Sequence, residues 1–110
     1  VPAESPVLEI DFSKSKEHLI YYGSKDLSSK KKIQRRKPKG VVGVEIIFLV
    51  GEKMPTDYDL MKPLALDTSS PYRVTYELHQ VGQRAYYAAC WYNTKGERGP
   101  WSEIVSALIN

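Results

Sequence analysis

The sequence has one cysteine, Cys90, and two histidines among 110 residues. A single cysteine cannot close a disulfide within the chain, so no redox compartment is indicated. His18 and His79 have no cysteine or carboxylate at the spacing of metal ligands, so we expect no metal, no cofactor and no catalytic centre. Cys90 lies among apolar residues with no base nearby in the pattern, and we interpret it as a packing residue rather than a nucleophile.

Long apolar runs are also missing. The longest, residues 41–50, is interrupted by a glycine and a glutamate and is too short for a membrane-spanning helix. The sequence predicts no signal peptide, and the chain starts at Val1 rather than at a methionine. Residues 1–6 are rich in proline and small side chains, as linkers between domains are. We therefore expect a processed product or a fragment of a larger protein, with a linker at 1–6 and one domain at 7–110.

Alternation of apolar and polar residues is the dominant pattern present. No window has the period of an amphipathic helix. Alternation predicts strands at 7–13 and 72–79, and apolar runs predict strands at 18–22 and 41–50. Two more strands are predicted at 84–93 and 101–109, on either side of a turn, and an irregular crossing with at most a short edge strand at 54–67. About seven short strands separated by turn residues predict an all-β antiparallel β-sandwich.

The C-terminal part carries a pattern that resembles a known family. An alternating strand over 86–92 ends at Asn93, a glycine-containing turn follows, and Gly-Pro-Trp-Ser-Glu at 99–103 begins the last strand. This run resembles the last two strands of fibronectin type III domains. It is more closely similar to the C-terminal module of uncharacterised Bacteroides-type proteins that have an N-terminal helical domain, which share the pattern from Asn93 to Ala107 and a lysine-rich loop before the third strand. The resemblance implies an Ig-like, fibronectin type III-like sandwich of bacterial origin. It implies no activity, because this fold hosts many functions.

Two of the predicted strands, 41–50 and 84–93, are apolar on both faces. If Phe48 and Trp91 face the core, the alternate positions of both strands face outward, whereas the outward positions of the other sheet are polar. A sheet with one hydrated face should alternate apolar and polar residues, and an exposed apolar patch marks an interface. The outward set, which we expect to contact an adjacent N-terminal domain or a second copy, comprises Ile47, Leu49, Tyr86, Cys90 and Tyr92. Two alternatives remain open: the register is shifted by one residue, or the 54–67 crossing covers this face.

Residues 25–39 hold eight cations and one acidic residue, Asp26, and predict a long loop. We interpret the loop mainly as a solvated segment. The alternative is that it binds nucleic acid or another polyanion, although no aromatic residue lies in it to stack on bases. The residues that would bind are Lys30, Lys31, Lys32, Arg35, Arg36 and Lys37.

These observations together predict a non-catalytic structural or protein-interaction module with no membrane contact. A carbohydrate-binding module that uses exposed aromatic rings is a further alternative. Such binding needs a concave groove with polar groups beside the ring, which the sequence does not locate.

Overall fold

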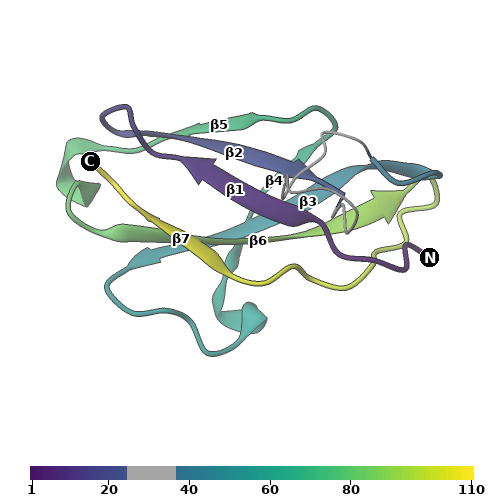
Figure 1. Cartoon of the computed structure of the whole chain (residues 1–110). Helices are drawn as coiled ribbons and strands as arrows, with labels where there is room; N and C mark the ends of the chain where they lie inside the picture. Colours follow the sequence, from purple (N-terminus) through teal and green to yellow (C-terminus); the bar gives the residue numbers. More distant parts are fainter. Residues whose placement is uncertain (25–36) are drawn as a thin grey trace.

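Two antiparallel sheets pack face to face in the computed structural model, which describes residues 1–24 and 37–110 (Figure 1). The smaller sheet has the strand order β1-β2-β5, and the larger sheet has the order β4-β3-β6-β7. The strands are β1 (Val7–Asp11), β2 (Glu17–Gly23), β3 (Val41–Gly51), β4 (Lys62–Asp67), β5 (Tyr72–Thr75), β6 (Arg84–Asn93) and β7 (Val105–Leu108). Two single 3-10 turns, η1 (Tyr58–Leu60) and η2 (Leu78–Gln80), lie in the connections. The predicted all-β antiparallel sandwich of about seven strands is confirmed.

The core between the sheets is made by the residues that the alternation placed inward. On β3 and β6 these are Val44, Ile46, Phe48, Val50, Tyr87, Ala89 and Trp91. Trp91 meets Tyr22 of β2 edge to face, with ring centroids 5.9 Å apart and planes at 71°. Burying each of these large side chains stabilises the fold by roughly 2–3 kcal/mol. A shift of one residue would turn both strands inside out, so this core also settles their register.

Two predicted strands are about half as long as expected, because their remaining residues lie outside the ladder of backbone hydrogen bonds. The strand predicted at 72–79 ends at Thr75, and the Glu77 amide donates to the side-chain oxygen of Gln80 at 2.8 Å to start η2. Leu78 is consequently 75% exposed rather than inward, and His79 lies in η2 rather than on a strand. At the C-terminus β7 begins only at Val105, and residues 101–104 run outside the ladder.

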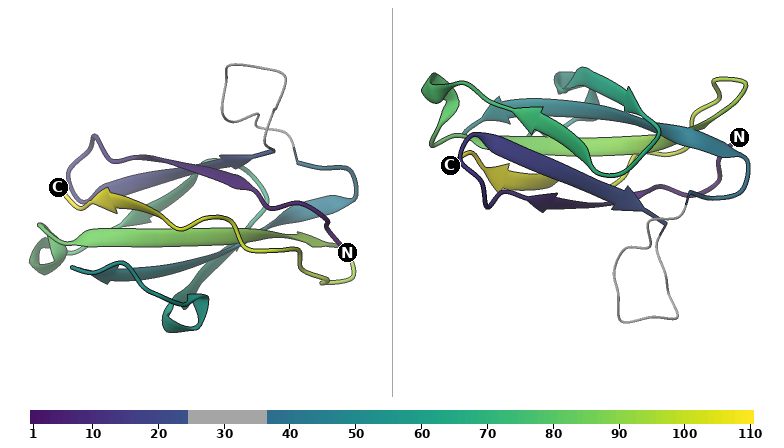
Figure 2. Two further views of the ribbon diagram at one scale, coloured as in Figure 1. Left: turned by 60° about the horizontal axis from the view of Figure 1, so that its bottom comes forward. Right: turned by 90° about the horizontal axis from the view of Figure 1, so that it is seen from above.

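The two faces of the larger sheet are both packed. Figure 2 shows η1 on the side of the larger sheet that faces away from the smaller sheet.

The termini lie at opposite ends of the sandwich (Figure 2). In residues 1–24 and 37–110 no helix is long and apolar enough to cross a membrane.

Candidate functional site

The middle of the outer face of the larger sheet is sealed by the chain itself. A second apolar cluster forms there from Ile47, Met61, Tyr86 and Ala88, with Leu49, Tyr58, Trp101 and Ile104 packed against it. Residues 52–61, here called the strap, cross this face and contribute Tyr58 and Met61. The Tyr58 ring stacks on Trp101 with centroids 6.0 Å apart, and its hydroxyl donates to the Ser102 carbonyl at 2.8 Å. The strap is therefore fastened to the segment that precedes β7.

The strap and residues 101–104 cover this face, and this corrects the interface that the sequence predicted. The outward orientation of Ile47 and Tyr86 is confirmed, because both belong to the outer cluster and not to the core between the sheets. Each is only 5% exposed, however, and Cys90 is fully buried. Ile47 and Tyr86 cannot touch a partner while the strap and residues 101–104 lie over the face, and Cys90, which lies near Glu45 and Arg98, has no exposed surface. Of the predicted set, Leu49 and Tyr92 are half-buried.

Cys90 behaves as a packing residue. Burial raises the pKa of its thiol to about 11, and the nearby Glu45 carboxylate adds to the shift. At pH 8 we expect a thiol reagent to modify native Cys90 at least about 100-fold more slowly than the unfolded chain, because only the thiolate reacts. The rate of reaction with Ellman's reagent, with and without denaturant, measures this ratio. Equal rates would contradict the burial of Cys90.

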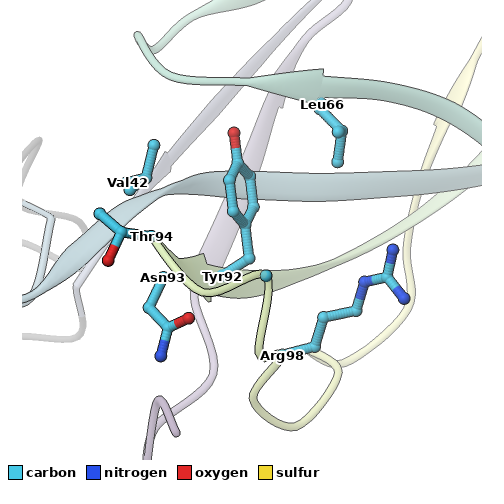
Figure 3. A pocket seen from close by; sticks show the side chains of 7 residues that line it. Val42, Leu66, Tyr92, Asn93, Thr94 and Arg98 are labelled. Carbon is cyan, nitrogen blue, oxygen red and sulfur yellow. The ribbon is translucent and has the colours of Figure 1, made fainter.

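One end of the outer face stays open. A hollow of about 280 Å³ lies beside the Tyr92 ring, and Figure 3 shows that ring standing across β3 between Val42 and Leu66. Leu66 pairs with Glu45 in the β3–β4 register and is 63% exposed. Arg98 lines the same hollow, and its Nε atom forms an ion pair with Glu45. We call Val42, Leu66, Tyr92 and Arg98 the open patch.

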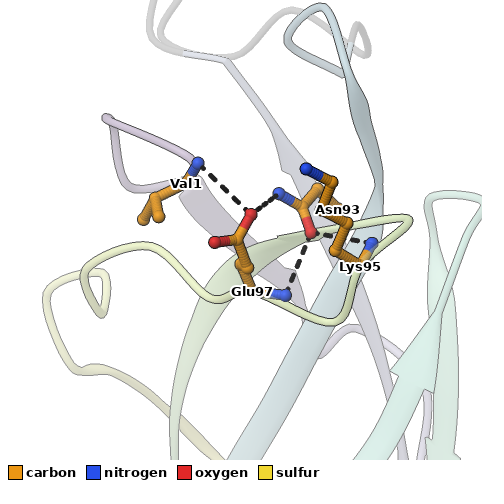
Figure 4. Close-up of polar contacts among 4 residues, drawn as sticks. All are labelled: Val1, Asn93, Lys95 and Glu97. Atoms are coloured by element: carbon orange, nitrogen blue, oxygen red, sulfur yellow. Dashed lines mark hydrogen bonds and ion pairs between the residues drawn. The ribbon is translucent and has the colours of Figure 1, made fainter.

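The rim of the open patch is fixed by the turn after β6. The Asn93 side-chain oxygen accepts from the backbone amides of Lys95 and Glu97, each at 3.0 Å (Figure 4). Its side-chain amide donates to Glu97 at 2.9 Å, and the Val1 ammonium lies 3.6 Å from the same carboxylate. The bond from Asn93 lowers the pKa of Glu97, and the ammonium lowers it further. Gly96 supplies the positive φ of 78° that this turn requires.

No protein-family model matches the chain, and no curated protein does. The function is therefore inferred from the geometry of the chain's own residues.

His18, considered above as a metal or catalytic candidate, is buried between the sheets. Its Nε2 atom lies 2.9 Å from the Leu108 carbonyl, which can only accept, so Nε2 carries the hydrogen. Nδ1 then accepts from the Tyr87 hydroxyl at 2.7 Å. Because the Tyr87 proton is used in this way, the Tyr76 hydroxyl donates to the Tyr87 oxygen at 2.5 Å. Both ring nitrogens are engaged within the core, which indicates a structural role.

A carboxylate of the strap is likewise engaged in local structure. Asp57, in the strap, accepts the Asp59 amide at 3.0 Å as the cap of η1. Within the part of the chain that the structure describes, no group of three or more His, Cys, Asp or Glu residues is placed to hold a metal ion.

The basic segment is represented among the described residues by Lys37 and Lys39. The Lys37 ammonium donates to the carbonyls of Val42 at 3.0 Å and Thr68 at 2.9 Å, so it is turned back onto the sandwich. Lys30, Lys31, Lys32, Arg35 and Arg36 lie outside the described residues. Polyanion binding by this segment stays a prediction.

Proposed function

We propose that this chain is a non-catalytic interaction module of a larger protein, which contacts a partner protein through the open patch on the outer face of its larger sheet. The partner is an adjacent domain or a second copy of the chain. The open patch takes the place of the predicted interface, whose middle the strap covers.

The observation that carries this proposal is the exposure of Leu66 beside the Tyr92 ring. Tyrosine and arginine are enriched at protein interfaces, where an aromatic ring supplies contact area and arginine supplies directed hydrogen bonds. Glu45 holds Arg98 in place, and the asparagine-capped turn fixes the neighbouring backbone. A prearranged surface loses less conformational entropy on binding than a mobile one does.

Replacing Leu66 by aspartate should weaken the contact at least about tenfold, because a carboxylate would have to be desolvated in the interface. The substitution should change the stability of the isolated domain little, since the side chain is 63% exposed. Leu78→Asp is the matched control, because Leu78 is 75% exposed and precedes the opposite end of β6. It should leave the contact intact.

Each of the two partners, a second copy of the chain and an adjacent domain, is tested by its own measurement. Sedimentation equilibrium over a range of concentrations detects self-association of the isolated domain. Amide and methyl spectra of the domain, alone and within its longer parent protein, detect contact with an adjacent domain. The proposal fails if the Leu66 and Tyr92 signals change neither with concentration nor in the longer protein.

We also propose that the module is fibronectin type III-like and related to the C-terminal modules of the Bacteroides-type proteins. The strand order β1-β2-β5 and β4-β3-β6-β7 supports this relationship, because that family's sandwich joins an edge strand, the third strand and the last two strands in one sheet. The run from Asn93 to Ala107 supports it independently.

Carbohydrate binding is the second candidate, and the Tyr92 ring is the observation that favours it. The ring borders a hollow that Thr94 and Arg98 also line, which is the combination of an aromatic face and polar groups that sugars require. The lining is mainly apolar, however, and the Asn93 amide is committed to Glu97. These features favour a protein partner. Retention of the wild-type domain, but not of a Tyr92→Ala variant, on a glycan affinity gel would reverse this preference.

A further inference from the structure

The hydrogen-bonded chain of Tyr76, Tyr87 and His18 joins four parts of the sandwich at the end where the chain terminates. His18 belongs to β2, Tyr87 to β6 and Leu108 to β7, while Tyr76 follows β5. The strand β7 has four residues and, among the described strands, pairs with β6 alone, along Arg84 to Tyr87. The bond from His18 to the Leu108 carbonyl therefore links the smaller sheet to the last strand.

This arrangement of hydrogen-bond donors and acceptors is possible only while His18 is neutral. A second proton on the imidazole would place an N–H at Nδ1, opposite a tyrosine hydroxyl that now donates to it. The Tyr87 proton would have to turn toward Tyr76, and the Tyr76 hydroxyl would lose its acceptor. Tyr76 is itself buried, so the chain cannot be repaired without moving one of its members.

Among residues 1–24 and 37–110, no charged side chain faces the imidazole to compensate for such a proton. The groups that face the imidazole are the two tyrosines, from β6 and from the β5–η2 connection, and the Leu108 carbonyl from β7. Burial lowers the pKa of His18, which the bond to Leu108 offsets only in part, and no charged side chain among the described residues contributes to the shift. Burial also raises the pKa of Tyr76, to about 12, and that of Tyr87, so both hydroxyls stay protonated near neutral pH.

We infer that the Tyr76–Tyr87–His18 chain is an acid-sensitive latch, which holds β7 and the adjoining η2 connection in place at neutral pH and releases them when His18 is protonated. Next to the latch, the Gly82 amide donates to the Ile109 carbonyl at 2.9 Å and the Ile109 amide donates to the Gln83 carbonyl at 2.8 Å. These two backbone bonds are the contacts that should open. The last residue has further bonds of its own, from the Lys16 amide to the Asn110 carbonyl and from the Asn110 side-chain amide to the Phe12 carbonyl, each at 2.7 Å, and these keep the C-terminus near the β1–β2 turn.

The sign of the pH dependence follows from the lowered pKa. Below about pH 6.5 a solvent-exposed His18 binds a proton that the closed latch excludes. Acid therefore favours the open form, and the latch weakens from pH 6.5 down to the pKa that His18 has in the folded state. The equilibrium constant for closing the latch falls by at most about tenfold for each pH unit, because opening takes up one proton.

Hydrogen exchange of individual amides tests the latch. Between pH 7.5 and pH 5 the protection factors of Gly82 and Ile109 should fall by up to about tenfold per pH unit below 6.5, while that of Ile46 in the middle of β3 should not. In His18→Gln, which cannot titrate, the protection of Gly82 and Ile109 should not depend on pH. The matched control is His79→Gln, the same substitution at an exposed histidine, and it should behave as the wild type does.

Three results would overturn the inference: constant protection of Ile109 in the wild type, an unchanged pH slope in His18→Gln, or an equal fall for Ile46, which would indicate global unfolding instead. If His18→Gln does not fold, the wild type alone suffices. Its His18 imidazole signals should then reach half-protonation below pH 6.5, together with the loss of protection at Ile109. A midpoint at or above 6.5 would contradict the latch.

Discussion

Substituting Gly43 with alanine should destabilise the domain by about 3 kcal/mol or more, as overpacking against fixed backbone does. A Cβ atom on Gly43 would lie 2.2 Å from the carbonyl oxygen of Asp67 and 3.2 Å from the Cα atom of Thr68. Both are backbone atoms, so β3 and the end of β4 would have to separate. That movement would also disturb the Asp67 carboxylate, which accepts the Tyr22 hydroxyl at 2.6 Å.

Gly51→Ala is the matched control for this prediction. Gly51 ends the same strand, has no positive φ and has no atom within 4 Å of where its Cβ would lie. Alanine there should change the free energy of unfolding by less than about 1 kcal/mol, in the stabilising direction, because it restricts the unfolded chain. Urea denaturation of the two variants measures the difference. Equal losses would mean that the close approach of Gly43 to Asp67 is not what sets the cost.

Replacing Ile47 by aspartate should cost about 4 kcal/mol, a large part of the stability of a domain of this size. Ile47 is 5% exposed beneath Met61 of the strap, so the substitution removes apolar contacts and buries a carboxylate that has no partner. The free energy of unfolding in urea measures the loss. Leu66→Asp, the same charge placed on the same face at its open end, should cost less than about 1 kcal/mol.

Comparing Ile47→Asp with Leu66→Asp also distinguishes a residue that is needed for folding from one that is needed for binding. If Ile47 were part of a free interface, Ile47→Asp would weaken association and leave stability unchanged. Because Ile47 is covered in the structure, any loss of association in Ile47→Asp would follow from unfolding of the domain. A small change in stability for Ile47→Asp would mean that the strap does not seal the face.

Much of the fold was predictable because β3 and β6 are long apolar strands whose successive side chains point to opposite faces of the sheet. Once one large aromatic residue is assumed to face the core, a period of two gives the direction of every other side chain on these strands. It places Ile46 and Trp91 inward, and Ile47 and Tyr86 outward. The extent of β5 was not predictable in the same way. Tyr76 continues the alternation, but its amide donates to the Lys16 carbonyl at 2.8 Å, and a turn capped by Gln80 follows.

The candidate site was harder to predict because it depends on contacts between segments that are distant in the sequence. Alternation shows that Ile47 faces outward, but it cannot show that Tyr58 and Trp101 stack over that face. Leu66 was missed for a related reason. The β3–β4 pairing contains a bulge at Ile46 and Ile47, so the face on which Leu66 lies could not be counted from the sequence.

The accessibility of methyl groups to a soluble nitroxide tests most directly whether the outer face is sealed in its middle and open beside Tyr92. Paramagnetic broadening of the Leu66 and Ile47 methyl signals would be compared in one sample of the wild-type domain at low concentration. The account predicts strong broadening for Leu66 and little for Ile47. Equal broadening of the two, or protection of Leu66 in the monomer, would contradict it.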